Sequence, residues 1–454
     1  MKNYFSSDFK LGVLGGGQLG RMLLAETQKF DIYTTVLDGN KNAPCAQICN
    51  KFVNGNLLDY KTIYNFGKGL DLLTIEIENV NLDALDVLEQ EGLTIYPTPK
   101  TLRIIQSKAR QKKFYIDHQI PTAPFSYYAY LEELKHSYEN NIIDFPFVWK
   151  SARFGYDGNG VKIVRDNIDL ESLPNVECII EKLIPFKKEL AVIVAKNKDG
   201  QTKTYPVVEM EFHPEANQVE YVICPARIEI NIANKAQEIA LKVVNDLDFI
   251  GLLAVEMFQT EDDEILVNEV APRPHNSGHY SIEASYTNQF EQHLRSILNL
   301  PLGNTESKVA GIMVNLVGEE GFSGNVVYEN FNDILKIDAN VSAYTSASSS
   351  NVDAFDSVGQ AADPFVASSG ASGSDEWVNG VIAYSHSSDD RNNIWGANIS
   401  VSKEYDYFSI GLAGNYTHLF NKKNTEVSIS GNVYFDQWKL IYPEEIRDYF
   451  DEDV

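Results

Sequence analysis

The chain has 454 residues, of which 44% are hydrophobic and 22% charged, as expected of a globular protein with about two to four domains. Its net charge of -26 argues against a general nucleic-acid-binding surface, but a local basic pocket for a small anion remains compatible with it. Four cysteines without zinc-site spacing, no signal-like N-terminus and no long apolar run predict a cytoplasmic protein with reduced thiols.

The N-terminal part predicts strands that alternate with helices, and therefore a parallel sheet. Short apolar strands are expected at residues 9–14, 34–37 and 70–77. A turn with Gly15, Gly17 and Gly20 follows the first strand, and Asp38 lies 18 residues beyond Gly20. Three interpretations stay open at this point: a nicotinamide or flavin site, a turn that binds another phosphate, or close strand–helix packing.

The middle of the chain predicts a strand that ends at Lys150, a glycine-rich loop at 153–160 and a second strand at 161–164. The amides of such a flap could close over a triphosphate, with Lys150 as a point charge; an ordinary hairpin turn is the alternative. A later strand at 178–185 could meet an adenine edge, and Glu189 could hold ribose hydroxyls. Taken alone, a solvated lysine and glutamate run explains that segment better.

Two further runs, 252–258 and 265–269, predict a β-hairpin with a two-residue loop at 262–263. Glu256 should then lie directly opposite Glu269. Carboxylates about 5 Å apart among apolar residues repel each other unless a cation lies between them, and hard oxygen ligands suit Mg²⁺ held with phosphates. An edge hairpin with two solvated glutamates is the alternative.

In order and spacing, these segments resemble the ATP-grasp superfamily, and within it the 5-(carboxyamino)imidazole ribonucleotide synthase family, from about residue 9 to about residue 338. The motifs that carry the resemblance are Gly15 to Met22, Thr74 to Val80, Lys108, Pro121 to Pro124, Lys150, Phe154 to Gly158, Glu181 to Glu189, Glu256, Asn268 with Glu269, and His275 to His279. The ordered set makes the nicotinamide interpretation much less favoured.

The resemblance implies an α/β protein, with an N-terminal Rossmann-like parallel sheet, then α+β ATP-grasp subdomains and a truncated small β domain. It implies an ATP-dependent ligase of purine biosynthesis that carboxylates aminoimidazole ribonucleotide with bicarbonate through carboxyphosphate. ATP and Mg²⁺ (or Mn²⁺) would be its cofactors. Its partners would be these small molecules and a second copy in a homodimer, with no nucleic acid and, for residues 1–338, no membrane.

The resemblance also implies site residues. On the nucleotide side these are Lys108, Lys150, Gly155, Tyr156, Asp157, Gly158, Gly160, Glu181, Lys182, Leu183, Ile184, Glu189, His213, Asn268 and Glu269. On the ribonucleotide side they are Gln18, Leu19, Glu76, Glu78, Tyr156, Asp157, Arg273, His275 and Asn276. Lys150, Asp157 and Arg273 would be catalytic, and Glu256 and Glu269 would bind the metal ion. His213 and His275 could instead be structural histidines.

Glu76 and Glu78 are two residues apart, so we expect them on one face of a strand, and either could meet the substrate.

The C-terminal part departs from the family. Residues 377–454 alternate as antiparallel β-hairpins do, and resemble strands of a β-barrel membrane protein, with a soluble β-meander as the alternative. Beyond Asp338 there are six lysines and arginines among 17 aspartates and glutamates. The basic run before a Gly-His with which the family reaches the substrate phosphates is missing.

We therefore expect five regions: a Rossmann-like pre-ATP-grasp domain (1–107), an ATP-grasp domain (108–300), a truncated C-terminal domain (301–338), a low-complexity linker (339–376) and a β-hairpin-rich tail (377–454). The tail is either a foreign fragment, which is favoured, or a lineage-specific replacement. Two other functions stay open: another ATP-grasp ligase of purine metabolism, or a catalytically impaired chimera that still binds nucleotide.

Overall fold

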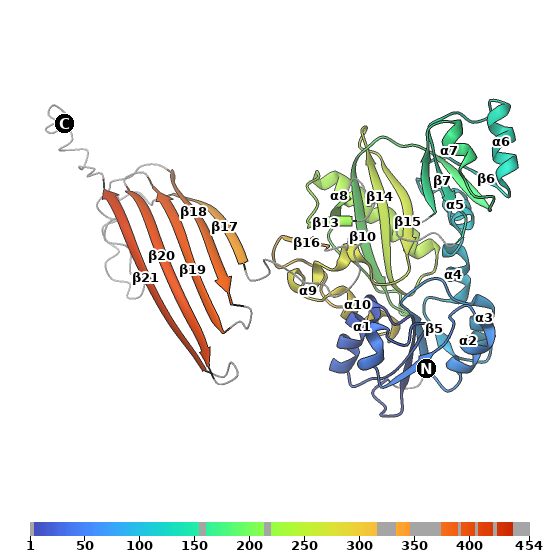
Figure 1. Cartoon of the computed structure of the whole chain (residues 1–454), viewed down its shortest axis with the longest axis horizontal. Helices are drawn as coiled ribbons and strands as arrows, with labels where there is room; N and C mark the ends of the chain where they lie inside the picture. The colour runs from blue at the N-terminus through green and yellow to red at the C-terminus, as the bar shows by residue number, and fades with distance from the viewer. Residues whose placement is uncertain are drawn as a thin grey trace. The chain divides into compact units, whose positions relative to one another are not determined.

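The computed structural model describes residues 4–153, 160–212, 219–315, 333–345, 374–388, 392–404, 407–420 and 425–438 (Figure 1). The chain divides into two compact units, Met1–Glu319 and Glu320–Val454. Within the described residues, no helix is both long enough and apolar enough to cross a membrane.

A five-stranded parallel sheet forms the N-terminal layer of the first unit. In spatial order its strands are β3 (Lys51–Asn54), β2 (Tyr33–Asp38), β1 (Lys10–Leu14), β4 (Leu72–Ile75) and β5 (Thr94–Ile95). Its helices are α1 (Gln18–Lys29), η1 (Pro44–Gln47), α2 (Tyr60–Gly67) and α3 (Leu82–Gln90). Leu11, Val13 and Leu14 of the central strand are fully buried, because helices cover both faces of the sheet. The predicted Rossmann-like layer is confirmed.

A small antiparallel sheet follows in the chain. Its order is β6 (Phe125–Tyr128), β9 (Cys178–Lys182), β7 (Phe147–Ser151) and β8 (Val161–Val164). The helices of this region are α4 (Pro99–Ile105), α5 (Lys108–Asp117), α6 (Leu131–Glu139) and α7 (Asn167–Glu171). The predicted strand ending near Lys150 and the strand after the glycine loop are β7 and β8, which pair as neighbours.

The largest sheet of the first unit has seven strands. Along its path they are β15 (Ile265–Ala271), β14 (Gly251–Thr260), β10 (Phe186–Lys196), β12 (Val208–Phe212), β13 (Val219–Cys224) and β16 (Gly311–Val314), with β11 (Thr202–Thr204) paired to β10. Helix α8 (Ile230–Asp246) covers one face, where its Val243 packs with Val192 and Val255. Side chains alternate along a strand, so Glu189 and Glu256 fall on the opposite face, toward the cavity described below.

A buried histidine joins the N-terminal sheet to the large sheet. His293 lies on α10 (Gln289–Ile297), which follows η2 (Asn276–Gly278) and α9 (Ser281–Ala284). Its Nδ1 accepts a hydrogen bond from the Leu252 amide at 3.2 Å, so Nε2 carries the proton that faces the Thr74 hydroxyl at 3.0 Å. This bridge holds β4 and β14 together, and with them the two sides of the cavity.

The second unit is a five-stranded antiparallel meander whose strands pair in chain order. They are β17 (Asp333–Thr345), β18 (Ser374–Ser387), β19 (Asn393–Lys403), β20 (Tyr407–Phe420) and β21 (Thr425–Trp438). The predicted antiparallel hairpins are confirmed. Strand β17 crosses the expected boundary between residues 338 and 339, and residues 346–373 of the expected linker lie outside the described residues.

In this meander, the strand register places apolar and polar side chains in separate rows on opposite faces. Ile382, Ile399, Leu412 and Val433 pair in one row across four strands, and each keeps about half of its surface exposed. The neighbouring row, on the other face, is Ala383, Asn398, Ala413 and Asn432. At these two rows, one face of the sheet is therefore apolar and exposed, and the other is built from alanine and asparagine.

Candidate active site

The hairpin with the two acidic residues forms, although its loop differs from the prediction. Near the tip Met257 pairs with Val267 and Gln259 pairs with Ile265. The Thr260 amide donates to the Glu264 carbonyl at 2.9 Å, and Asp263 adopts a φ of 60°. The loop therefore has three residues, and the predicted two-residue loop is wrong. A left-handed residue in the third loop position is the usual way to close such a turn.

A β-bulge restores the predicted pair. Between Glu256 and Met257 the register shifts by one residue, which leaves Asn268 as the extra residue of β15 and puts Glu256 opposite Glu269. A bulge re-aims the side chains on its strand, and Asn268 and Glu269 both line the cavity. The predicted pairing of the two glutamates is confirmed, but through a longer loop and a bulge whose effects cancel.

The two glutamates titrate in opposite directions. Burial raises the pKa of Glu256 to about 8, and the charges of Glu269 and Glu189 add to that effect. Lys108, in direct contact with Glu269, lowers the pKa of that carboxyl to about 2. The repulsion predicted from sequence is therefore relieved by a lysine on one carboxylate and by retention of a proton on the other.

His275 faces Glu256 with a defined tautomer. Its Nδ1 accepts the Ser277 amide hydrogen at 3.3 Å, so the ring proton sits on Nε2, which lies 3.3 Å from Glu256 Oε1. Burial, with help from the neighbouring charge of Arg273, lowers the pKa of His275 to about 3. His275 is therefore a neutral hydrogen-bond donor to Glu256.

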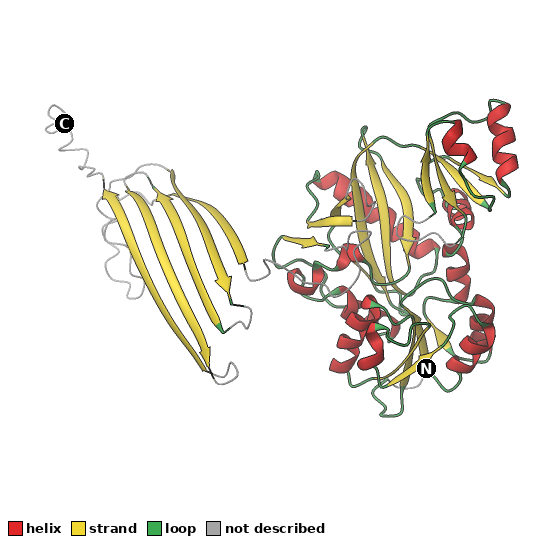
Figure 2. Cartoon of the chain, in the orientation of Figure 1, coloured by secondary structure: helices red, strands yellow, loops and turns green. Residues whose placement is uncertain are grey.

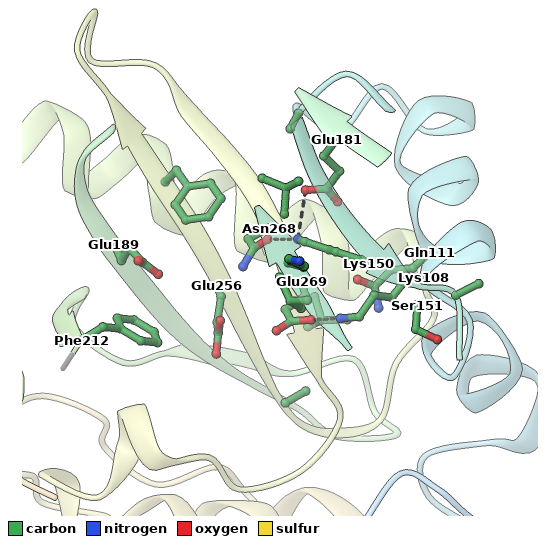
Figure 3. Close-up of a pocket in the computed structure, with 18 of the residues that line it drawn as sticks. Lys108, Gln111, Lys150, Ser151, Glu181, Glu189, Phe212, Glu256, Asn268 and Glu269 are labelled. Carbon is green, nitrogen blue, oxygen red and sulfur yellow. Dashed lines mark hydrogen bonds and ion pairs between the residues drawn. The ribbon is translucent and has the colours of Figure 1, made fainter. Parts of the chain in front are cut away.

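A second cluster joins the small sheet to the bulge. Lys150 Nζ on β7 lies 2.9 Å from Glu181 Oε2 on β9 and donates to Asn268 Oδ1 at 2.8 Å (Figure 3). Glu181 also lies 2.9 Å from Lys112 Nζ on α5. Burial opposes ionisation of Glu181, yet the two lysines outweigh it and hold its pKa below the usual range.

These groups surround a cavity of about 1240 Å³, larger than the pockets that hold most small ligands. Many of the predicted site residues line it: Glu78, Lys108, Lys150, Glu181, Lys182, Leu183, Ile184, Glu189, Glu256, Asn268, Glu269, Arg273, His275 and Asn276. Phe186, Phe212 and Phe258 add apolar surface beside Glu189. The cavity therefore has a partly aromatic end and an end formed by Glu78, Arg273 and His275.

Other predicted residues lie elsewhere. Gly155, Tyr156, Asp157, Gly158 and His213 are outside the described residues. Gln18 and Leu19 begin helix α1 and, like Glu76 and Gly160, are not among the residues that line the cavity.

The glycine turn is occupied by the chain's own carboxylates. The Gly16 amide donates to Asp38 at 2.7 Å and the Gly20 amide to Glu76 at 3.4 Å. A Cβ on Gly17 would lie 2.5 Å from Glu76 Oε1, so a side chain there would displace the carboxylate. The amides that a dinucleotide would need are thus already used, which explains the glycines by close packing.

Glu76 and Glu78 are separated by the end of their strand. Strand β4 stops at Ile75, so the expectation that both share one strand face is wrong. Glu76 turns into the glycine turn, whereas Glu78 lines the cavity and accepts a hydrogen bond from Arg273 Nε at 3.1 Å.

Lys112 and Gln111 are two of several polar residues at this site that the sequence did not predict. Both are buried on α5, and Gln111 lines the cavity. Lys112 follows Lys108 by four residues, which places both lysines on one face of a helix. That spacing was a usable signal, because Lys108 was already a candidate.

The donor set fits a magnesium ion shared with a ligand. Glu256 on β14 and Glu269 on β15 offer opposed carboxylates, and Asn268, which precedes Glu269 on β15, adds an amide oxygen that accepts a hydrogen bond from Lys150. Among the described residues no three His, Cys, Asp or Glu side chains gather as a metal site. Mg²⁺ is commonly held by one or two carboxylates and by substrate phosphates, so such a small protein donor set suits it.

Comparison with known proteins identifies the family. Residues 9–106 match the ribonucleotide synthetase preATP-grasp domain, and residues 113–290 match the ATP-grasp domain. The N5-carboxyaminoimidazole ribonucleotide synthase of Bacillus subtilis (strain 168) is 38% identical over 314 residues, which cover 68% of this chain and 81% of that protein. The chain spans only 56% of the chloroplastic phosphoribosylaminoimidazole carboxylase of Vigna aconitifolia, at 39% identity over 68% of this chain.

Solved structures agree with the sequence comparison. The N5-carboxyaminoimidazole ribonucleotide synthetase of Thermotoga maritima superposes with a TM-score of 0.63 at 41% identity, covering 72% of this chain and 84% of that one. The Aspergillus clavatus N5-carboxyaminoimidazole synthase in complex with ADP and 5-aminoimidazole ribonucleotide gives 0.64 at 36% identity, covering 70% and 84%. The chain belongs to the N5-carboxyaminoimidazole ribonucleotide synthase family of ATP-grasp ligases.

Proposed function

We propose that the chain uses ATP to carboxylate aminoimidazole ribonucleotide with bicarbonate, in purine biosynthesis. The observation that carries the proposal is the cavity in which Lys108 and Lys150 face the carboxylate and amide oxygens of Glu256, Asn268 and Glu269. Family membership supports the same reaction, and the Aspergillus clavatus relative binds ADP and the ribonucleotide.

The two ends of the cavity support two binding regions. ATP would lie along Glu181 to Glu189, where apolar side chains such as Phe212 and Phe258 flank a carboxylate suited to ribose hydroxyls. The ribonucleotide would lie at the end with Glu78 and Arg273. The opposed glutamates lie on the cavity face of the hairpin, and this position supports transfer of the γ-phosphoryl group near them.

Charge neutralisation is the main task of this site. Phosphoryl transfer needs a positioned acceptor and compensation of the phosphate charge, more than a covalent nucleophile. Lys108 and Lys150 would supply that compensation. Glu256, Glu269 and Asn268 would hold Mg²⁺ (or Mn²⁺), which when bound acts as a Lewis acid on phosphoryl oxygens.

Arg273 suits the anionic co-substrate. Its Nε bonds to Glu78 at 3.1 Å, which fixes the guanidinium while other N–H groups remain to face the cavity. A fork of donors can hold bicarbonate, and then the carboxyphosphate formed when a bicarbonate oxygen attacks the γ-phosphorus and ADP leaves. His275 is neutral and would orient Glu256 by its Nε2 hydrogen bond. It would not act as a general base.

The test is the dependence of ATP consumption on both co-substrates. We expect the full chain to release ADP only when bicarbonate and aminoimidazole ribonucleotide are both present. Equal ADP release with another amine or an amino acid would overturn the substrate assignment. Formate in place of bicarbonate would indicate a formyl-transferring ligase of purine metabolism instead.

A second candidate is a chain that binds nucleotide but turns over poorly. The observation in its favour is the acidic tail, with six basic residues among 17 acidic ones beyond Asp338 and no basic run toward the substrate phosphates. This would follow if the tail is a foreign fragment joined to a truncated enzyme. Tight binding of an ATP analogue together with no measurable turnover would support it.

We also propose a cytoplasmic homodimer, as the family resemblance suggests. The four cysteines are free thiols, and three of them are buried. Light scattering coupled to size-exclusion chromatography would test the dimer, and a single-chain mass at all concentrations would overturn it.

A further inference from the structure

Lys112 is buried beside the cavity but does not line it. Only 2% of its surface is exposed, and its Nζ lies 2.9 Å from Glu181 Oε1 and 2.6 Å from the Thr122 hydroxyl. Burying an ammonium group is costly unless partners compensate it. A lysine at this position is costly to bury, so its two contacts indicate a role beyond packing of the core.

In the hydrogen bond between Lys112 and Thr122, the lysine is the donor. The Thr122 hydroxyl donates its only proton to the Val267 carbonyl at 2.7 Å, so it must accept from Lys112. The Val267 amide in turn donates to the Pro121 carbonyl at 2.8 Å. Val267 immediately precedes the bulged residue Asn268. Lys112 is thus connected through one hydroxyl to the segment that aims Asn268 and Glu269 into the cavity.

Lys150 makes a parallel connection from the cavity side. It contacts the other oxygen of Glu181 at 2.9 Å, and the Asn268 side chain at 2.8 Å. If Lys150 binds the nucleotide phosphates, as the proposed function requires, its ammonium group can no longer contact Glu181 alone. Glu181 would then depend on Lys112 to stay ionised and in place.

We propose that Lys112 is a positioning residue, which holds Glu181 and the bulged segment of β15 in place while Lys150 engages the phosphates of ATP. This inference rests on the proposed function. It assigns no contact with the nucleotide to Lys112, which acts through Glu181, Thr122 and the β15 backbone. Glu181 begins the segment 181–184 that lines the nucleotide region, so its displacement should weaken ATP specifically.

The pKa directions agree with this role. Burial lowers the pKa of Lys112 to about 8, while contact with Glu181 opposes that decrease. The pKa of Glu181 is held below its usual range although burial opposes its ionisation. Around neutral pH the pair is therefore charged, which a bridging role requires.

The test compares Lys112→Met with a matched control in the full chain. The control is Lys135→Met, which removes an ion pair of 2.6 Å with Glu171 outside the cavity. We expect Lys112→Met to raise the KM for ATP, and the Kd of a non-hydrolysable ATP analogue, about 10- to 100-fold, by analogy with the loss of groups that orient metal ligands. The KM for the ribonucleotide should change less than about twofold, and the control should change neither constant.

Two outcomes would overturn the inference. One is a lower Tm with unchanged KM and Kd for ATP, which would leave Lys112 a core ion pair only. The other is an equal rise of KM for both substrates, which would indicate general distortion. If Lys112→Met does not fold, Thr122→Val keeps the side-chain shape and should raise the Kd of the ATP analogue more than about threefold; no change would overturn the link to β15.

The analogue-binding measurement separates this inference from the proposed function. A wild-type chain that binds the analogue but shows no turnover with bicarbonate and the ribonucleotide would defeat the proposed reaction. The effect of Lys112→Met on analogue binding would still decide the positioning role.

Discussion

The two units differ in whether the apolar faces of their β-sheets are covered. In the first unit helices cover the sheets (Figure 2), and charged side chains such as Lys112, Lys150 and Glu181 are almost fully buried around a cavity. In the described strands of the second unit, Ile382 and Leu412 keep about half of their surface exposed. A sheet needs a second layer to bury its apolar face. The first unit therefore has the enclosed, low-dielectric environment that strengthens electrostatic interactions, and the described strands of the second unit provide none.

The largest effect expected from this contrast concerns Lys150. Lys150→Met should lower kcat/KM for ATP about 10²- to 10³-fold, because it removes a positioned charge where phosphate charge develops. Steady-state kinetics would measure this, with Lys403→Met on the exposed side of β19 as a control that should have no effect. If Lys150→Met kept full activity, the chemistry would not reside in the cavity of the first unit.

Two glycines sharpen the contrast in packing. Gly17→Ala should destabilise the first unit by about 1–3 kcal/mol, because the new Cβ would lie 2.5 Å from Glu76 Oε1. Gly431→Ala on β21 meets nothing within 4 Å and should be neutral or slightly stabilising. Calorimetry would follow each unit's transition. Equal losses in both units would contradict the difference in packing.

A pH effect on stability is expected in the first unit. Burial raises the pKa of Glu189 from 4.5 to about 7, partly opposed by Lys150. The folded state thus favours the protonated carboxyl. The stability that the protonated Glu189 contributes is fully present below about pH 4.5 and is lost as the pH rises through about 7. After allowance for solvent, the loss is roughly 1–2 kcal/mol.

Glu189→Gln should flatten the stability profile of the first unit between pH 4.5 and pH 7. Chemical denaturation of the nucleotide-free chain at several pH values would measure it. A variant with the same slope as wild type would show that Glu189 is ionised throughout this range.

The smallest effect on activity should come from removing the second unit. A chain of residues 1–319 should keep kcat/KM for ATP within about twofold of the full chain, since every residue that lines the described cavity belongs to the first unit. Its binding of a hydrophobic dye should fall, because the exposed apolar face is gone. A loss of activity above tenfold would mean that the second unit contributes to catalysis.

The sequence by itself determined the parallel N-terminal sheet, the hairpins of the C-terminal part and many of the charged residues around the cavity. Alternating and periodic apolar patterns are local, so they can be recognised without knowledge of the fold. The two strand-like runs also predicted that Glu256 would oppose Glu269, although with a two-residue loop and no bulge.

Only the tertiary structure decided which side chains meet across long separations. Lys150 and Asn268 are 118 residues apart and Thr122 and Val267 are 145 apart, so no local pattern links them. The same holds for Glu76, which fills the glycine turn 56 residues before it. Such contacts form when sheets and helices dock, because a side chain's partners depend on where its strand ends and which layer covers it. The sequence predicts which charged groups are present. Tertiary packing determines which of them form ion pairs, which are buried and which face the cavity.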